Sequence, residues 1–129
     1  MRVIAGTARG KNLQALPGED VTRPTINRVK EAMFSSVQFL VPGARVLDLF
    51  AGSGQLGIEA LSRGAESAVF VERRKDALQA IRENLEACGF SDRARVVNGD
   101  AMSYLKSGEK FDLIFLDPPY ASGLLQQAL

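Results

Sequence analysis

The sequence predicts an α/β fold in which helices cover both faces of a parallel sheet. Three observations lead to this prediction. Short apolar segments alternate with segments of helical periodicity, the apolar segments are continuous runs, and a glycine-rich loop follows the first of them. The expected strands span residues 45–50, 67–71, 95–98 and 111–116. Because a doubly wound sheet normally has more strands, we expect the chain to be truncated after the fourth core strand.

The N-terminal segment is expected to add a small β-hairpin and a helix. Residues 2–5 and 11–16 can pair as short strands across a glycine-containing turn. Thr25 is expected to cap a helix that runs from residue 26 to about residue 39. The apolar face of this helix would comprise Ile26, Val29, Met33, Phe34 and Val37.

Two further helices are expected between the strands, over residues 54–62 and 74–88. Gly89 suits the position that follows the second of them, where a left-handed residue often ends a helix. We therefore divide the chain into a basic hairpin and helix, residues 1–40, and a sheet domain, residues 41–129, whose C-terminal part is missing.

Composition narrows the chemistry. The chain has 129 residues, of which 46% are hydrophobic and 24% charged, as in an ordinary soluble domain. Because it contains no histidine, a Ser-His-Asp triad and most zinc sites are excluded, and we expect no metal. The single cysteine, Cys88, excludes an internal disulfide and indicates a reducing compartment. Without a long apolar run or a signal peptide, we expect no contact with a membrane, and the reducing compartment is expected to be the cytoplasm. We also expect a monomer.

Charge is unevenly distributed along the chain. Residues 1–30 hold six basic and two acidic residues, a net charge of +4, whereas residues 31–129 hold ten basic and 13 acidic residues, a net charge of −3. A basic segment on a mildly acidic body suggests a polyanion partner, although a solvated surface hairpin explains the charge equally well. The candidate phosphate contacts are Arg2, Arg9, Lys11, Arg23 and Arg28.

The loop after the first expected strand contains Gly52, Gly54 and Gly57 in a Gly-x-Gly-x-x-Gly pattern. Glycines at this place allow a tight turn and let a ligand approach the backbone closely. Both a dinucleotide and S-adenosylmethionine fit the pattern. Asp48 favours S-adenosylmethionine, because a carboxylate beside the glycines repels a pyrophosphate but attracts a cationic methionine group.

Three acidic residues lie at the ends of three successive expected strands. Asp48 ends the first, Glu72 the second and Asp100 the third. Each alone is more simply interpreted as a helix cap or a loop acid. Together they are expected to converge at the carboxyl edge of the sheet, where such folds bind ligands. Glu72 can hold a ribose diol there, and Asp100 can accept a hydrogen bond from an adenine amino group.

The fourth expected strand is followed by Asp117, Pro118, Pro119 and Tyr120. Two successive prolines stiffen the chain and remove two backbone donors. The Asp117 carboxylate and the Pro118 carbonyl can accept the two N–H bonds of a flat, neutral amino group. The Tyr120 ring can stack on the ring that carries this group. We therefore regard these four residues as the candidate catalytic segment.

Taken together, these motifs resemble the RsmD family, a branch of the class I S-adenosylmethionine-dependent methyltransferases that modify amino groups. The resemblance covers the whole chain. It rests on the segments Arg2–Gly6, Thr22–Thr25, Arg28–Phe34, Leu47–Gly54, Gly57–Ala65 and Phe115–Tyr120.

The resemblance implies a Rossmann-like enzyme that methylates the exocyclic N2 amine of one guanine in 16S ribosomal RNA. Its expected cofactor is S-adenosyl-L-methionine, and its expected partner is ribosomal RNA or the assembling small ribosomal subunit. In such families the glycine loop surrounds the methionine part of the cofactor, and the basic segment faces RNA. The residues expected to bind the cofactor are Asp48, Phe50, Gly52, Gly54, Glu72, Asp100 and Ala101.

Three alternatives remain open at this stage. The amine could belong to adenine N6 or to another nucleic-acid base, because the segment from Asp117 to Tyr120 does not distinguish them. A nicotinamide-dependent oxidoreductase would use the same glycines but would leave Asp48 and that segment without a role. The chain could also be a truncated fragment that binds RNA or cofactor without activity.

Overall fold

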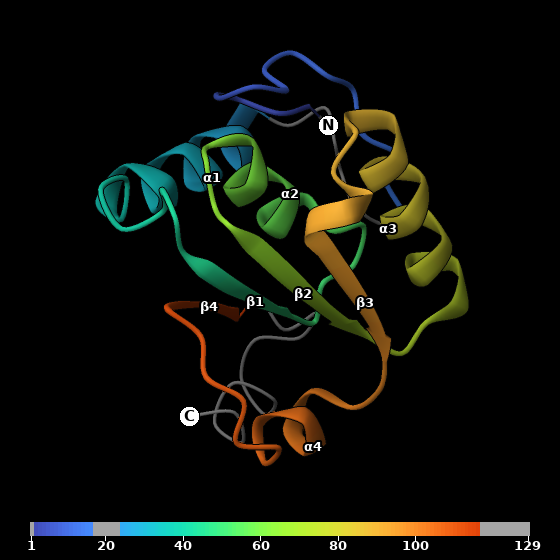
Figure 1. The fold of residues 1–129 in the computed structure, drawn as a ribbon. Coiled ribbons are helices and arrows are strands. Elements are labelled where there is room, and N and C mark those ends of the chain that lie inside the picture. Colours follow the sequence, from blue (N-terminus) through green and yellow to red (C-terminus); the bar gives the residue numbers. More distant parts are fainter. Residues whose placement is uncertain (1, 17–23, 117–129) are drawn as a thin grey trace.

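The fold is built on four parallel strands. The computed structural model describes residues 2–16 and 24–116. The strands are β1 (Arg45–Leu49), β2 (Ser67–Glu72), β3 (Ala94–Asn98) and β4 (Leu113–Leu116), in the spatial order β3-β2-β1-β4 (Figure 1). The predicted parallel sheet is thus confirmed. The chain builds outward from β1 to β3 and then returns to the other side of β1, so a topological switch point lies between β1 and β4.

Helices lie on both faces of the sheet, as predicted. Helices α1 (Pro24–Ser36), α2 (Gln55–Ser62) and α3 (Lys75–Cys88) cover one face, and the short helix α4 (Ala101–Leu105) lies against the other (Figure 1). Alternate strand residues point to opposite faces. Val46, Phe70 and Phe115 therefore pack under the first three helices, whereas Leu47 and Val71 pack toward α4.

Burial on both faces explains why the strands read as continuous apolar runs. Helix α3 follows its sequence pattern closely, since Ala77, Leu78, Ile81 and Leu85 are all buried. Gly89 ends it in the left-handed conformation, with φ of 75°, as predicted.

The structure corrects the predicted helix α1. It begins at Pro24, so Thr25 lies within its first turn and does not precede it as a cap. Proline suits a first helical position because its fixed φ is already helical and its missing N–H has no helical partner there. The helix ends at Ser36, and Val29 is 60% exposed although its spacing placed it on the apolar face. Phe34 on the same helix is fully buried, as expected.

Two short elements were not predicted. Helix α4 and the 3₁₀ turn at Ser91–Arg93 have five and three residues, too few to produce a periodic pattern in the sequence. None of the helices in the described ranges is long and apolar enough to cross a membrane.

The predicted N-terminal hairpin is reduced to a single bridge. Arg2 and Asn12 form one antiparallel pair, and Val3 exchanges backbone hydrogen bonds with Gly10 and Lys11. The pairing predicted between residues 2–5 and 11–16 is therefore present, but it is limited to this one bridge. We call residues 2–16 the N-terminal arm. It is held in place by α2 and α3, beside which it lies in Figure 1.

A buried carboxylate anchors the arm to α2. Glu59 is fully buried and accepts the N–H groups of Ile4 and Ala5 at 2.9 and 3.0 Å. It also pairs with Lys30 at 3.1 Å and with Arg63 at 2.8 Å. Burial raises the pKa of Glu59, but the Ile4 N–H and the two cations outweigh it and hold that pKa below its usual value. The carboxylate therefore stays ionised inside the protein.

Candidate cofactor-binding site

The glycine loop, residues 50–54, turns sharply between β1 and α2. Phe50, Gly52 and Gly54 all have positive φ, at 56°, 59° and 84°. Glycine adopts this region without strain, whereas phenylalanine does so at some energetic cost. A strained residue of this kind is typical of a ligand-binding turn. Gly54 is the N-cap of α2, and its N–H donates to the Ala51 carbonyl at 2.8 Å.

The third glycine of the motif serves packing. A Cβ added at Gly57 would lie 2.4 Å from the Phe70 ring, far inside van der Waals contact. Only glycine lets α2 approach β2 this closely. The sheet thereby brings the first turn of α2 to the carboxyl end of β1.

Glu72 ties the glycine loop to the end of β2. Its Oε1 accepts the Gly52 N–H at 2.9 Å, and its Oε2 accepts the N–H groups of Arg73 and Arg74, both at 2.9 Å. A carboxylate has about four acceptor positions, so these three bonds leave one for a ligand hydroxyl. Glu72 thus lies at the end of β2, as predicted, and its side chain contacts the glycine loop.

Asp48 points to the first turn of α2. Only 1% of it is exposed, and its Oδ2 accepts the Gly57 N–H at 3.0 Å. Its neighbours in the sheet are Phe70 and Phe115, so the carboxylate lies on the face that α2 covers. A negative charge near a helix N-terminus is favourable there. Asp48 therefore orders the loop whatever it contributes to a ligand.

Asp100 caps the helix that follows β3. Its Oδ2 accepts the Ser103 N–H at 3.0 Å, and its Oδ1 lies 3.6 Å from Arg73. The backbone hydrogen bond from Ser103 lowers the pKa of Asp100, and Arg73 adds to this effect. The simpler interpretation of this residue, a helix cap, is thus realised. The Asp100 side chain remains 43% exposed, so its Oδ1 can accept a further hydrogen bond.

Glu72 and Asp100 lie close together at the carboxyl edge of the sheet. Glu72 and Asp100 share Arg73 as a neighbour, and the Gly99 N–H donates to the Glu72 carbonyl at 3.0 Å. Asp48 lies one strand away, two register positions earlier than Glu72. The predicted Ala101 is buried against the sheet, so only its backbone can face a ligand.

The candidate catalytic segment from Asp117 to Tyr120 lies outside the described residues. It follows Leu116 directly, and Leu116 pairs with Leu49 at the carboxyl end of β1. Leu116, the last described residue, thus lies at the switch point between β1 and β4.

Sequence reasoning missed two residues at this site. The Oε1 atom of Gln55, at the first position of α2, is buried and has no hydrogen-bond donor among the described residues. A buried acceptor without a partner is unusual, which makes it a candidate contact for a ligand donor. Asn84 of α3 donates to the Ser53 carbonyl at 3.0 Å. Neither residue belongs to a motif, so only the tertiary contacts reveal them.

Four of the five predicted RNA contacts belong to the described residues. Arg2, Arg9, Lys11 and Arg28 are exposed, and the bridge between Arg2 and Asn12 brings the first and third of them close together. Arg23 lies outside the described residues. Lys30, which contributes to the basic charge of this segment, is only 3% exposed and pairs with Glu59. Burial lowers the pKa of Lys30.

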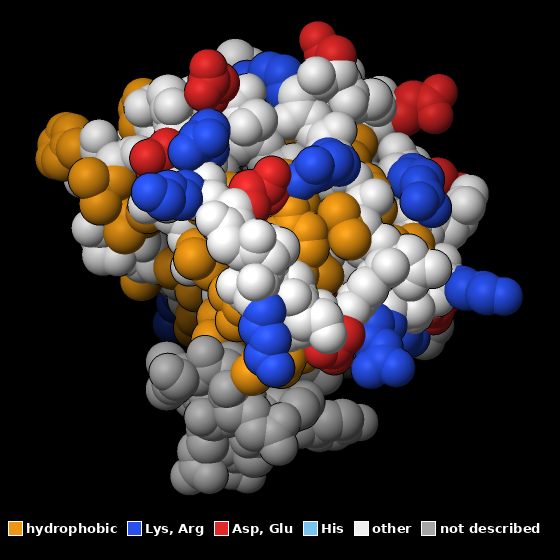
Figure 2. Space-filling model, turned by 60° about the horizontal axis from the view of Figure 1, so that its bottom comes forward, with side chains coloured by type: hydrophobic (Ala, Val, Ile, Leu, Met, Phe, Trp, Pro, Cys, Tyr) orange, Lys and Arg blue, Asp and Glu red, His pale blue; other side chains and the backbone are white. Residues whose placement is uncertain are grey.

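Basic residues are not confined to the arm. Figure 2 shows the side of the molecule that lies at the bottom of Figure 1. On this side, Lys and Arg side chains are interspersed with acidic ones around a strip of apolar surface. This mixed pattern favours contacts at several points over one continuous basic surface. Among the described residues, no group of three histidine, cysteine or acidic side chains could hold a metal ion.

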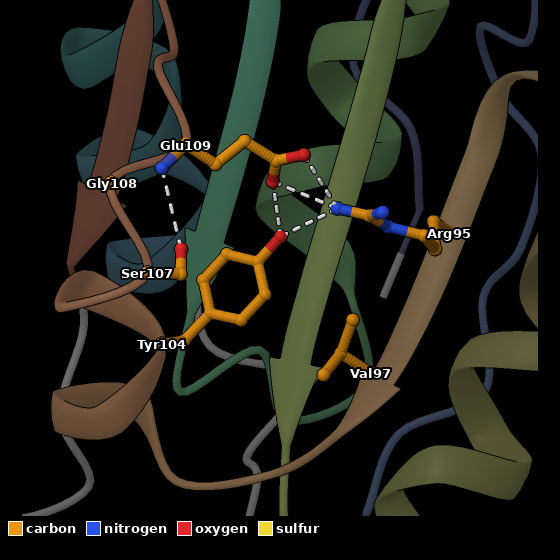
Figure 3. Close-up of a pocket in the computed structure, with 6 residues that line it drawn as sticks. All are labelled: Arg95, Val97, Tyr104, Ser107, Gly108 and Glu109. Carbon is orange, nitrogen blue, oxygen red and sulfur yellow. Dashed lines mark hydrogen bonds and ion pairs between the residues drawn. The ribbon is translucent and has the colours of Figure 1, made fainter.

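A shallow hollow of about 530 Å³ lies beside β3, away from the glycine loop. Figure 3 shows Arg95, Tyr104 and Glu109 pointing toward one another across it. Arg95 donates to the Tyr104 hydroxyl at 2.6 Å and to Glu109 at 2.8 Å, and the Tyr104 hydroxyl also donates to Glu109. The Tyr104 hydrogen bond lowers the pKa of Glu109. The hydrogen-bonding groups of these three side chains pair with one another, so we interpret the cluster as structural: it holds α4, and with it the Asp100 cap, against β3.

The comparisons with known proteins agree with this geometry. A family model described as "Conserved hypothetical protein 95" matches residues 1–129. The chain belongs to this family, the RsmD family. "Ribosomal RNA small subunit methyltransferase D" of Haemophilus influenzae is 40% identical over 134 residues, covering 100% of this chain and 68% of that protein. The protein of the same name from Escherichia coli strain K12 is 40% identical over 130 residues, covering 100% and 65%. The chain thus spans about two thirds of the length of these relatives.

Solved structures confirm the fold class. The structure of yhhF from Escherichia coli has a TM-score of 0.85 and 38% identity, covering 99% of this chain and 68% of that one. A SAM-dependent methyltransferase from Agrobacterium tumefaciens has a TM-score of 0.60 and 26% identity, covering 72% and 31%. The RsmD-family chain therefore has the Rossmann-like fold of class I methyltransferases, with a parallel sheet and helices on both faces.

Proposed function

We propose that this chain carries the cofactor-binding part of an enzyme that transfers a methyl group from S-adenosylmethionine to the N2 amine of a guanine in small-subunit ribosomal RNA. The observation that carries the proposal is the glycine loop, strained at Phe50 and bound to Glu72 through the Gly52 N–H. Membership of a family with members named as small-subunit rRNA methyltransferases supports the reaction class. The reducing compartment expected from Cys88 agrees with action in the cytoplasm.

The described residues suit this cofactor. The one acceptor position that remains on Glu72 would hold a ribose hydroxyl. The Asp100 side chain is half-exposed, and its Oδ1 would accept a hydrogen bond from the adenine amino group. The Oε1 of Gln55, which has no hydrogen-bond donor in the part of the chain that the structure describes, would offer negative potential to the cationic methionine end, as would the buried Asp48. When bound, S-adenosylmethionine supplies a methyl group on a positively charged sulfur that leaves as a neutral thioether.

The residues after β4 would position the target amine. Its lone pair is delocalised into the purine ring, so it is a poor nucleophile unless its N–H bonds are oriented. The Asp117 carboxylate and the Pro118 carbonyl would accept these two bonds, and Pro119 would keep the backbone stiff. Tyr120 would stack on the base, an interaction worth about 1–3 kcal/mol. Orientation of this kind accounts for much of the rate.

A proton must leave the nitrogen once it is methylated. Methylation makes the nitrogen cationic and therefore acidic, so Asp117 or water can accept its proton. This explains how a chain without histidine can support the reaction. The guanine must reach the segment edge-on, so it would be unpaired or turned out of its stack.

The test measures cofactor binding and methyl transfer separately. Calorimetry with S-adenosylmethionine should show saturable binding, and Glu72→Ala should weaken it about tenfold or more, because hydrogen bonds to the carboxylate are lost. Glu83→Ala on α3 is the control, since the Glu83 side chain accepts a hydrogen bond from Gln79 of the same helix and not from the glycine loop in the described structure. Binding that is equal in both variants would remove Glu72 from the site.

In a full-length version of the enzyme, transfer to 16S rRNA should be lost in Asp117→Ala while cofactor affinity stays within about twofold. Asp92→Ala, an exposed aspartate in the turn before β3, should leave transfer unchanged. Nuclease digestion and mass spectrometry of the product distinguish N2-methylguanine from N6-methyladenine. Near-normal turnover in Asp117→Ala would refute the proposed role of that residue.

A further inference from the structure

One buried side chain connects the N-terminal arm to the glycine loop. Asn84 of α3 is 2% exposed. Its Oδ1 accepts the Gln14 N–H at 2.7 Å, and its Nδ2 donates to the Gln14 carbonyl at 3.1 Å. The same Nδ2 donates to the Ser53 carbonyl at 3.0 Å. Gln14 belongs to the arm and Ser53 to the glycine loop, so one amide group holds both segments.

The geometry points to Asn84 as a positioning residue through which the arm controls the cofactor loop. This inference rests on the proposed function, in which the arm contacts RNA and the loop contacts S-adenosylmethionine. A side-chain amide has two N–H donors and one carbonyl acceptor. In Asn84 both donors and the acceptor are engaged. The amide therefore has no spare N–H donor with which to replace a partner that moves away.

Burial makes the two sets of bonds interdependent. If Gln14 moves, the Oδ1 of Asn84 and one of its N–H groups lose their partners inside the protein, where unpaired polar groups are unfavourable. The amide can recover bonds only by turning, which pulls it away from Ser53. Ser53 is itself fully buried between Gly52 and Gly54, so a change at its carbonyl alters the turn.

The N-terminal arm contacts α3 at Leu16 as well as at Gln14, so movement of the arm would reach Asn84. Leu16, two residues after Gln14, packs on Ala77 and Ala80 of α3, one to two turns before Asn84. Arg2 and Lys11, exposed and basic, lie at the bridge between Arg2 and Asn12, which precedes Gln14 by only two residues. RNA bound at those residues would therefore fix the arm against α3. Because coupling is reciprocal, bound S-adenosylmethionine would favour RNA binding by the same factor.

Four variants of the full chain test the coupling. Asn84→Ala removes the shared amide, and Gln14→Pro removes the N–H that Asn84 accepts but keeps the Gln14 carbonyl. Gln14→Ala keeps the backbone and is the control for the arm. Gln79→Ala removes an exposed amide from the same helix and is the control for α3. Calorimetry measures affinity for S-adenosylmethionine, and amide hydrogen exchange measures protection of residues 52–57.

We expect Asn84→Ala and Gln14→Pro each to weaken S-adenosylmethionine binding about two- to tenfold, the range of one net hydrogen bond. Both should increase exchange at residues 52–57, and the two controls should change neither quantity. In the double variant Gln14→Pro should have no further effect, because its route to the loop is already absent. Thermal melting confirms that each variant is folded at the measurement temperature.

The inference fails if Gln14→Pro leaves both affinity and exchange unchanged while Asn84→Ala alters them, since Asn84 would then only support the loop. It also fails if the two effects add in the double variant. Failure of the proposed function gives a different result. If the unmodified chain does not bind S-adenosylmethionine, exchange at residues 52–57 still reports whether Gln14 and the loop are coupled.

Discussion

Replacement of Glu59 by glutamine should lower the free energy of unfolding, because it disrupts the contacts that hold the N-terminal arm and α1 to α2. Glu59 is fully buried and accepts two backbone N–H groups, Lys30 and Arg63. A glutamine has one oxygen, so its NH₂ group would face donors. Lys30, whose side chain is only 2% exposed, would lose its charge partner.

The magnitude follows from the burial of the pair. Removing one partner of a buried ion pair typically costs about 3–5 kcal/mol. This is a large part of the total stability of a small domain, about 5–15 kcal/mol. With a urea m-value of about 2 kcal/mol per M, the unfolding midpoint of Glu59→Gln should fall by about 2 M.

The controls separate this effect from a general loss of charge. Glu86→Gln changes an exposed residue of α3 and should alter stability by less than about 0.5 kcal/mol. Lys30→Met should cost less than Glu59→Gln, because Glu59 keeps Arg63 and the N–H groups of Ile4 and Ala5. A loss below about 1 kcal/mol in Glu59→Gln, or a larger loss in Lys30→Met, would refute the reasoning.

Three other outcomes are expected. The folded-state pKa of Glu59 lies below its ordinary 4.5, so its contribution to the free energy of unfolding is complete above pH 4.5 and is lost as pH falls through the folded pKa. The unfolding free energy of the unmodified chain should therefore fall more steeply on acid titration than that of Glu59→Gln. Gly57→Ala should lower the unfolding free energy by about 1–3 kcal/mol through its overlap with Phe70, whereas Gly99→Ala, whose nearest contact is 3.6 Å, should be close to neutral in the same urea titration. Arg9→Ala should reduce the slope of log affinity for RNA against log salt by about 1, and an unchanged slope would exclude Arg9 from phosphate contact.

The carboxyl edge of the sheet was predictable because its signals are local and ordered along the chain. Apolar runs, the glycine pattern and the acids at strand ends all follow from residues a few positions apart. The parallel order then places Asp48, Glu72 and Asp100 on neighbouring strands without further information. What these residues bind stays a prediction, and the segment from Asp117 to Tyr120 lies outside the described residues.

By itself, then, the sequence determined the α/β class, the strand limits to within about two residues and the glycine loop, because hydrophobic period and turn chemistry are encoded in neighbouring residues. Only the tertiary structure decided that Lys30 is a buried ion-pair partner, that the arm is a single bridge anchored by Glu59, and that Asn84 joins Gln14 to Ser53. Apart from the bridge itself, these contacts join residues 29 to 70 positions apart, and each depends on a polar side chain that looks like solvated surface in the sequence. Burial, which gives them their energetic weight, arises only when the distant segments pack together.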